Sequence, residues 1–399
     1  MPHVGRAVEP LRISRQTGLS SGSGLLLENH SPTRLTVSMG FNCGIIGLPN
    51  VGKSTIFNAI ASAQAQMENY PFCTIEPNRG VVAVPDRRLH TIARVLGKED
   101  PIPTTIELVD VAGLVQGASK GEGLGNKFLG HVRSVDAIIH VVRCFRDADV
   151  AHSSGDVNPL QDVEIVNTEL MLADMALLEH ASERLAKQAK AGEKDATHRL
   201  QYMADMIEEL NKGVMLNALR WPDPVTQIAQ EYGLITFKPI LYLANSDESG
   251  QSAAWRETIE DFAATQAAAC VFLLGKLEQE ISELEDDEKQ DFLEAMGLQQ
   301  SALNRLVEKA YGLLDIITFY TATTAVQAWT VGVGTSVYAA AGRIHTDFQK
   351  GFVRAEVCHS DNLVESGSEH HAREKGLLRT EGKDYTVQDG DVIHFLFNP

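Results

Sequence analysis

The glycine-containing run at residues 47–55 constrains the possible fold of this chain more than any other feature. Residues 47–55 have the sequence GLPNVGKST, which fits the pattern G-x-x-x-x-G-K-[ST]. The apolar run 43–46 before it predicts a short buried strand, and residues 56–61 after it predict the start of a helix. Glycines at 47 and 52 allow the backbone to turn its N–H groups toward phosphate oxygens at the positive end of that helix. The sequence therefore predicts an α/β fold that binds a nucleoside triphosphate.

Each residue type in this loop matches one part of a nucleoside triphosphate. We expect the Lys53 ammonium to contact the β- and γ-phosphates and the Ser54 hydroxyl to bind Mg²⁺. Successive backbone N–H groups complete the phosphate cradle. The loop residues predicted to bind the nucleotide are Asn50, Val51, Gly52, Lys53, Ser54 and Thr55.

A second motif, DVAG at 110–113, follows the apolar-rich run 105–109, which predicts a strand. In P-loop enzymes an acidic residue at such a strand end holds the Mg²⁺ shell, and the glycine N–H can reach the γ-phosphate. We therefore assign these roles to Asp110, acting through water, and to Gly113. Thr74, in a segment bracketed by prolines that discourage helix, is placed to complete the metal coordination. The predicted cofactor is Mg²⁺, held by Ser54, Thr74 and Asp110.

The residue after Gly113 differs from that of Ras-like enzymes, in which a glutamine orients the attacking water. Leu114 stands at this place and offers no hydrogen bond to water. Either hydrolysis is very slow, or another group positions the water. The stretch 117–127 that follows is rich in glycine and predicts a mobile loop.

The segment expected to contact the base is Asn245-Ser246-Asp247-Glu248, after the apolar run 237–244. Guanine-specific GTPases have N-K-x-D at this place, with an aspartate that accepts hydrogen bonds from guanine N–H groups. Here Asp247 stands one place early, Glu248 occupies the reading position and Ser246 replaces the lysine. We predict that Asn245, Ser246 and Glu248 contact the nucleotide, that guanine selection is weakened, and that adenine is admissible.

Two amphipathic runs lie between these motifs. Apolar residues step by three and four from Val163 to Ala181 and again from Leu200 to Val214, with Gly192 between the runs. The pattern predicts an antiparallel helical hairpin in which each stripe buries the other. Four basic residues cluster near its tip, either as a solvated face or as a contact for RNA. They are Arg184, Lys187, Lys190 and Lys194.

Composition bounds the class of protein. The 399 residues, 44% of them hydrophobic, suffice for two or three domains, and five cysteines without a C-x-x-C pair favour a reducing compartment. No apolar run approaches the ~20 residues that a membrane-spanning helix needs, and a net charge of −18 argues against a generally basic nucleic-acid binder. We expect a cytoplasmic protein without a membrane partner. Residues 1–38 predict a disordered extension, and a transit peptide, which would direct the chain to an organelle, is the alternative.

Several long motifs together resemble those of the YchF-type Obg-like ATPases, and the resemblance extends from residue 39 to the end of the chain. The resemblance implies a Mg²⁺-dependent protein of the translation-factor class that prefers ATP to GTP and hydrolyses ATP slowly. It also implies a regulatory switch in translation or stress response, with ATP, the ribosome (its large subunit) and RNA as partners. The motifs are GLPNVGKST at 47–55, NYPFCTIEPN at 69–78, DVAGLV at 110–115, GASKGEGLGN at 117–126 and VQDGDVIHF at 387–395.

The same resemblance implies an architecture. It consists of a G-domain-like fold with a mainly parallel sheet, an inserted antiparallel coiled-coil arm and a C-terminal β-grasp TGS domain. One position departs from the family, which has Ser-Ala or Ser-Gly where this chain has Leu274-Gly275, so that a hydroxyl near the base is missing. The expected division is a disordered extension at 1–38, a nucleotide-binding domain at 39–160 and 234–315, the helical insert at 161–233 and the TGS domain at 316–399.

His152 is the candidate for the group that positions water in place of the missing glutamine. It follows the apolar run 137–145, a predicted central strand, at the carboxyl edge where ligands bind in open α/β sheets. It also resembles the family's catalytic histidine, and an imidazole can orient water near neutral pH. His140 and His131 are less favoured alternatives.

Two other functions remain open, a small-molecule P-loop kinase and a nucleotide-gated scaffold with negligible turnover.

Overall fold

The computed structural model describes residues 41–65, 78–111, 124–152, 155–190, 192–284 and 286–398. Residues from Met39 to Pro399 form one compact unit. Among the described residues, no helix is both long enough and apolar enough to cross a membrane. Predictions for residues 1–38, Thr74, Gly113, Leu114 and most of the stretch 117–127 lie outside the described residues.

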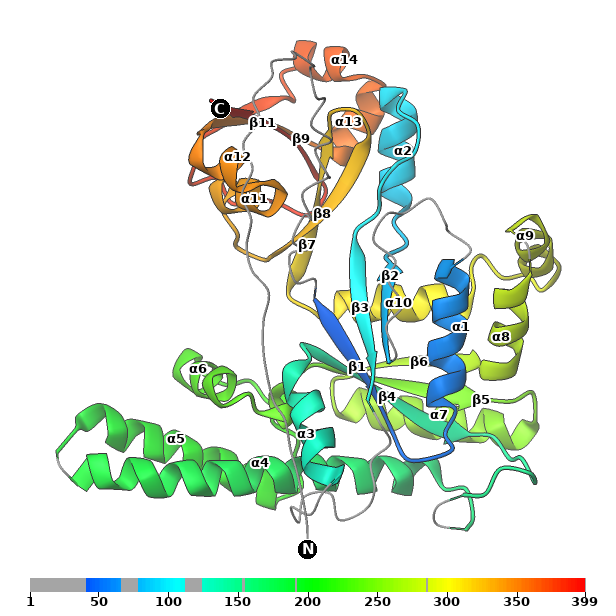
Figure 1. Ribbon diagram of the computed structural model, residues 1–399, viewed down its shortest axis with the longest axis vertical. Helices are drawn as coiled ribbons and strands as arrows, with labels where there is room; N and C mark the ends of the chain where they lie inside the picture. Colours follow the sequence, from blue (N-terminus) through cyan, green and yellow to red (C-terminus); the bar gives the residue numbers. More distant parts are fainter. Residues whose placement is uncertain are drawn as a thin grey trace, which may run out of the picture. The chain divides into compact units, whose positions relative to one another are not determined.

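A six-stranded sheet carries the phosphate-binding loop (Figure 1). Its order is β2-β3-β1-β4-β5-β6, and all neighbouring pairs are parallel except β2 with β3. Every residue of β4 and β5 is buried, as expected for central parallel strands covered on both faces. The strands are β1 (Asn42–Ile46), β2 (Arg79–Ala83), β3 (Thr105–Asp110), β4 (Ala137–Cys144), β5 (Ile240–Ser246) and β6 (Ala269–Leu274). The predicted α/β fold with a mainly parallel sheet is confirmed.

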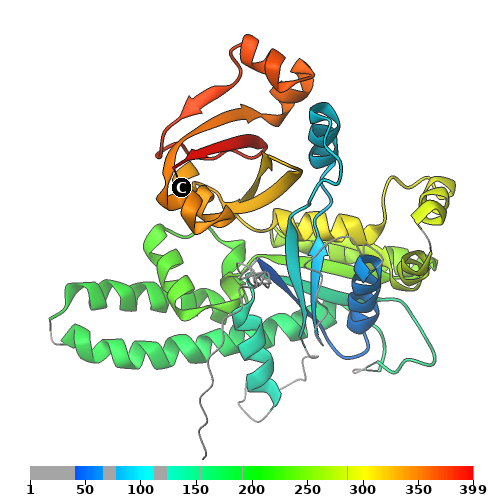
Figure 2. The ribbon, with the colours of Figure 1, turned by 45° about the horizontal axis from the view of Figure 1, so that its top comes forward.

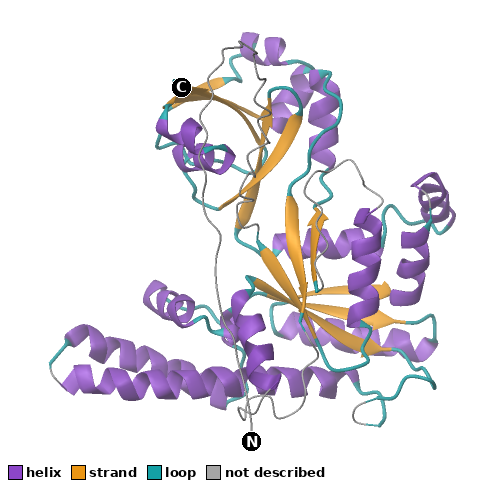
Figure 3. Cartoon of the chain, in the orientation of Figure 1, coloured by secondary structure: helices purple, strands orange, loops and turns teal. Residues whose placement is uncertain are grey.

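Helices lie on both faces of this sheet (Figure 3). One hydrophobic core joins the sheet to these helices, with Ile56, Val132, Val166 and Leu306 among its buried members. The helices around the sheet, apart from those of the helical hairpin, are α1 (Lys53–Ala65), α3 (Leu124–Ser134), α7 (Gly250–Thr265), α8 (Gly275–Glu283), α9 (Asp286–Ala295) and α10 (Ala302–Gly312). Because the strands and helices alternate along the chain, the loops after β1, β4, β5 and β6 meet at one edge of the sheet.

The two amphipathic runs form the helices α4 (Pro159–Lys190) and α5 (Lys194–Asn211), which lie antiparallel (Figures 1 and 2). Gly192 between them has a φ of 93°, a conformation that other residues rarely adopt. The first half of α4 packs against the sheet and not against α5. In this half Asn167 donates a hydrogen bond to the Tyr242 hydroxyl on β5 at 3.3 Å. Only the second half of α4 lies against α5, where the Ser182 hydroxyl is 3.4 Å from the Met203 sulfur. The two stripes thus bury each other along the second half of α4, and the stripe of its first half packs on the sheet, a contact that the sequence did not predict.

The chain returns from this hairpin to the sheet through short elements. These are the 3₁₀ turn η2 (Leu216–Ala218), helix α6 (Asp223–Tyr232) and the 3₁₀ turn η3 (Ile235–Phe237). Asp174 on α4 is fully buried and accepts hydrogen bonds from the Thr236 N–H and hydroxyl at 2.7 and 2.8 Å. Arg133 at the end of α3 forms an ion pair with the same carboxylate at 3.1 Å. Thus one buried carboxylate joins α3, α4 and η3.

A five-stranded sheet of order β10-β9-β11-β7-β8 forms the C-terminal part. Its central strand β11 is parallel to β7 and antiparallel to β9, which is the arrangement of a β-grasp fold. Helix α11 packs on it around Phe319, Phe352 and Phe395. The elements are β7 (Ile316–Ala322), β8 (Val326–Gly332), α11 (Val337–Ile344), α12 (Thr346–Lys350), β9 (Phe352–His359), α13 (Ser360–Ser366), α14 (Glu369–Glu374), β10 (Arg379–Glu381) and β11 (Asp391–Phe397).

Helix α2 (Arg87–Leu96), between β2 and β3, packs on this C-terminal sheet. It begins at Asp86, whose side chain accepts the Arg88 N–H and also the hydroxyl proton of Tyr320 on β7. Arg88 forms an ion pair with Asp389 at 2.6 Å. The buried face of α2 consists of Leu89, Ile92 and Ala93, in one cluster with Tyr320, Val326, Ala328 and Leu363. The sequence predictions assigned no such contact to residues 86–97.

We expect Ile92→Ala to destabilise the protein by about 2–5 kcal/mol, because Ile92 is completely buried and the change leaves a cavity. The shift of the unfolding midpoint in denaturant measures this effect. His90→Ala, at an exposed position of the same helix, is the matched control and should change stability little. Equal stabilities of the two variants would show that α2 does not hold the C-terminal sheet.

Candidate functional site

The phosphate-binding loop links β1 to α1 and takes a conformation that depends on its glycines. A Cβ atom at Gly47 would lie 2.5 Å from the Val141 carbonyl oxygen, and Gly52 has a φ of 95° with the Asn245 amide directly against it. Asn50 has a φ of 61°, in the left-handed region. The loop is therefore closely packed against β4 and β5, as its sequence pattern requires.

Lys53 lies at the centre of this loop with only 8% of its surface exposed. Its ammonium donates hydrogen bonds to the carbonyl oxygens of Gly47 at 3.0 Å and Leu48 at 2.7 Å. Burial lowers the pKa of Lys53 to about 8, and the nearby Asp110 carboxylate opposes this shift. A phosphate group, which is negative, would provide the countercharge that these neutral carbonyls do not supply.

The predicted metal ligands Ser54 and Asp110 lie side by side. The Ser54 hydroxyl is 3.5 Å from one Asp110 carboxylate oxygen, a long contact, and the other oxygen is buried without a hydrogen-bond partner. Burial raises the pKa of Asp110. A buried carboxylate oxygen without a partner beside a serine hydroxyl fits the oxygen-rich surroundings that Mg²⁺ prefers. These two residues therefore fit the predicted cofactor.

Asn245, at the end of β5, connects the phosphate loop to the segment after β6. Its amide nitrogen donates to the Val51 carbonyl at 3.0 Å, and its amide oxygen accepts the Gly275 N–H at 3.1 Å. Asp247 faces the start of α7, where its carboxylate accepts the Ser249 N–H at 2.9 Å. The Asp247 carboxylate thus stabilises a turn, in agreement with its place outside the reading position.

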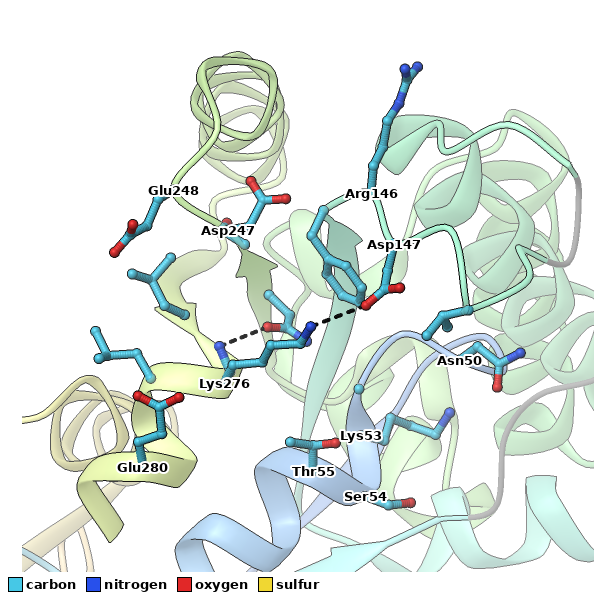
Figure 4. Close-up of a pocket in the computed structure, with 18 residues that line it drawn as sticks. Asn50, Lys53, Ser54, Thr55, Arg146, Asp147, Asp247, Glu248, Lys276 and Glu280 are labelled. Atoms are coloured by element: carbon cyan, nitrogen blue, oxygen red, sulfur yellow. Dashed lines mark hydrogen bonds and ion pairs between the residues drawn. The ribbon is translucent and has the colours of Figure 1, made fainter. Parts of the chain in front are cut away.

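A cavity of about 670 Å³ lies among these segments (Figure 4). Of the predicted nucleotide-binding residues, its lining includes Asn50, Gly52, Lys53, Ser54, Thr55, Asn245, Ser246 and Glu248. Val51 is not in the lining, because its side chain is buried in the core and only its carbonyl faces Asn245. The structure therefore brings together residues that are up to about 200 positions apart in the sequence.

Leu274 and Gly275, which the resemblance places near the base, also line the cavity, and the sequence predictions missed the remaining lining residues. Except for Asp247, these come from the segments after β4 and β6, and one ion pair, from the Lys276 ammonium to the Asp147 carboxylate at 3.2 Å, joins the two segments (Figure 4). The missed residues are Phe145, Arg146, Asp147, Val150, Asp247, Lys276, Leu277 and Glu280. The signal that could have found them is their place at the carboxyl ends of predicted parallel strands, next to the phosphate loop.

His152 does not line this cavity. Its ring nitrogen Nε2 lies 2.9 Å from the carboxylate of Asp162, in the first turn of α4, and both side chains are 4% exposed. His140 is enclosed in β4 beside Tyr242, and burial lowers its pKa to about 3, so that its ring is neutral. His131 is exposed on α3. In this arrangement none of the three histidines is in the lining of the cavity.

Comparisons with known proteins match this chain over most of its length. The family model MMR_HSR1, described as "50S ribosome-binding GTPase", matches residues 42–179, and the model YchF-GTPase_C, described as "Protein of unknown function (DUF933)", matches residues 316–398. The "Ribosome-binding ATPase YchF" of Haemophilus influenzae is 48% identical over 90% of this chain and all of its own length. The chain belongs to the YchF family.

Other members support the assignment. The YchF proteins of Escherichia coli O157:H7 and Bacillus subtilis, with the same printed name, are 46% and 45% identical over 90% of this chain and all of their own length. The solved structure of the Schizosaccharomyces pombe YchF GTPase has a TM-score of 0.79 and 31% identity, and the match covers 90% of this chain and 98% of that one. The predicted resemblance to YchF-type proteins is confirmed.

We expect phosphate-containing nucleotides to bind more weakly as the pH rises above the pKa of Lys53, which burial lowers to about 8. Above this pH the lysine is neutral before binding, and a proton must be taken up to form the ammonium–phosphate contact. From pH 7.5 to 9.5 the association constant for Mg²⁺-ATP should fall about tenfold or more.

Titration by calorimetry at several pH values measures this fall. Lys53→Met is the control, because it has no titrating group at position 53 and its weaker binding should stay constant over the same range. A parent protein whose affinity is equally constant would show that the Lys53 ammonium makes no contact with the phosphates.

Proposed function

We propose that this chain binds ATP with Mg²⁺, hydrolyses it slowly to ADP and phosphate, and acts as a ribosome-associated regulatory switch in translation or stress response. The observation that supports it most directly is the cavity in which the buried Lys53 ammonium, the Ser54 hydroxyl and the base-side residues Ser246 and Glu248 meet. The printed names of the bacterial relatives, "Ribosome-binding ATPase YchF", agree with this proposal.

Within this proposal each residue has one role. Lys53 pairs with the β- and γ-phosphates, and the N–H groups of Asn50, Val51, Gly52 and Thr55 complete the cradle. Gly113 presents its N–H to the γ-phosphate. Ser54, Thr74 and, through water, Asp110 hold Mg²⁺, which when bound neutralises charge on the phosphate oxygens. On the base side, the roles belong to Asn245, Ser246 and Glu248.

The printed names of relatives include both ATPases and a GTPase, so the choice of base rests on the site of this chain. Asp247 and Glu248 both line the cavity, and one Asp247 carboxylate oxygen accepts the Ser249 N–H. The residue at the reading position is Glu248. No aspartate therefore occupies the position from which N-K-x-D proteins accept the N–H groups of guanine. Leu274 and Leu277 add apolar surface to the cavity, which suits a purine face without selecting guanine.

We further propose that the helical insert at 161–233 and the C-terminal domain at 316–399, of TGS type, bind the large ribosomal subunit and RNA in the cytoplasm. Residues 39–160 and 234–315 then form the nucleotide-binding domain. The four basic residues near the end of the α4–α5 hairpin are exposed, and none of them takes part in the ion pairs of the described residues. Such unpaired cations favour contact with a phosphate backbone.

ATP should compete for the site at least as well as GTP. The double change Ser246→Lys with Glu248→Asp should shift the preference toward GTP, because it places an aspartate at the reading position. Competition calorimetry measures the ratio, and Glu257→Asp, on the exposed face of α7, is the matched control that should leave it unchanged. A parent protein that binds GTP tenfold more tightly than ATP, about 1.4 kcal/mol, would contradict the argument.

His152 can act on water only if its ring leaves Asp162 and turns toward the phosphates. We expect His152→Ala to reduce turnover at saturating ATP by about 10² while the affinity for ATP stays unchanged, as for a group needed only in the chemical step. His90→Ala, an exposed histidine on α2, is the control. Equal phosphate release by parent and His152→Ala would remove His152 from the mechanism and leave backbone groups and the glycine-rich loop as candidates. Negligible release by both proteins would favour a nucleotide-gated scaffold.

A further inference from the structure

Arg143, the last residue but one of β4, is among the largest fully buried side chains of the molecule, with 1% of its surface exposed. Within the described part of the chain its guanidinium forms no ion pair with a carboxylate. Burial lowers its pKa, and the carboxylates of Asp147 and Asp162 oppose this shift from a distance. A buried charge of this kind is stable only if its N–H groups find acceptors.

Those acceptors are backbone carbonyls, all but one of them in the segment 145–151. Arg143 Nε donates to Phe145 at 3.2 Å and one terminal nitrogen to Val150 at 3.0 Å. Three longer contacts, each of 3.5 Å, lead to the carbonyls of Asp147, Ala151 and Asn50. The guanidinium also lies 4.6 Å from the centre of the Phe145 ring, a cation–π distance.

Asn50, in the phosphate-binding loop, reaches the same segment from the other side. Its amide nitrogen donates to the Ala151 carbonyl at 3.1 Å, so that Asn50 and Arg143 share this acceptor. The left-handed φ of 61° at Asn50 directs its backbone carbonyl toward the Arg143 guanidinium. Two side chains, one from β4 and one from the loop, thus fasten residues 145–151 to the phosphate-binding loop.

We propose that Arg143 is a positioning residue for nucleotide binding, which together with Asn50 fixes the 145–151 wall of the nucleotide cavity. This inference rests on the function proposed above. The wall supplies Phe145, Asp147 and Val150 to the cavity and leads directly to His152. Arg143 itself does not line the cavity, so it acts through the wall. Lysine cannot replace it, because a single ammonium lacks the planar fork that reaches several carbonyls at once.

The test compares Arg143→Lys and Asn50→Gly with the parent protein. Glycine at position 50 keeps the left-handed backbone and removes only the Asn50 amide. In the nucleotide-free protein, the amides of residues 146–151 should exchange hydrogen at least tenfold faster in both variants, with no change elsewhere. The affinities for ATP and ADP should fall by the same factor, about tenfold, because the Asp147–Lys276 ion pair joins the wall to the segment after β6, which we assign to the base side of the cavity.

A control variant and a double variant complete the test. Arg379→Lys, in the C-terminal sheet, is the matched control and should match the parent. The double variant should lose less than the sum of the two single effects, since both side chains act on the Ala151 carbonyl. If Arg143→Lys fails to fold, Asn50→Gly alone decides.

Unchanged exchange at 146–151, faster exchange throughout the protein, or faster local exchange with unchanged nucleotide affinity would each overturn the inference. A parent that binds no ATP would instead disprove the proposed function. In that case hydrogen exchange alone would still show whether Arg143 and Asn50 hold the wall.

Discussion

The nucleotide site depends on two hydrogen bonds made by the side chain of Asn245. Its amide joins the Val51 carbonyl, 194 residues earlier, to the Gly275 N–H, 30 residues later. An asparagine side chain can donate and accept at once, and here both functions are used on backbone groups that would otherwise be buried without partners. Because β1, β5 and β6 end at the same edge, one side chain can hold the loops after all three.

Buried charged side chains near the site also hold the surrounding segments in place, because each of them requires specific partners. Lys53, Arg143, Asp162 and Asp174 are each at least nine-tenths removed from solvent. Each is held by specific partners: carbonyls for the two cations, His152 for Asp162, and Thr236 with Arg133 for Asp174. Leaving any of them unpaired would cost several kcal/mol. Residues 145–152 are therefore joined both to the phosphate loop and, through His152 and Asp162, to the first turn of α4.

The elements that follow from local pattern were predicted from the sequence, and those that depend on distant contacts were not. The strands around residues 43–46 and 137–145 follow from apolar runs bounded by motifs, and the hairpin follows from a helical period with Gly192 as its break. The apolar positions 89, 92 and 93 predict a helix face but cannot indicate that the face meets Tyr320, which lies in the C-terminal sheet.

The residues of the site divide in the same way between those predicted from local pattern and those that depend on distant contacts. Lys53 and Ser54 were recognised because their spacing is local, whereas Phe145, Lys276 and Arg143 depend on which strands become neighbours. Arg143 did carry a signal, since it is the one charged residue in the otherwise apolar run AIIHVVRCF. A charge in a predicted central strand has to be satisfied by specific partners, and so indicates a functional or positioning role.

The departure at Leu274-Gly275 also has a physical explanation. A Cβ atom at position 275 would lie 2.7 Å from the amide oxygen of Asn245, so a side chain there would require the Asn245 amide to shift. Gly275, which the family also has in its Ser-Gly form, accommodates this close approach without a shift. Leu274, one residue earlier, lines the cavity with an apolar surface. At the place where the resemblance implies a hydroxyl, this chain therefore has an apolar side chain, and Ser246 and Glu248 are polar side chains in the same lining.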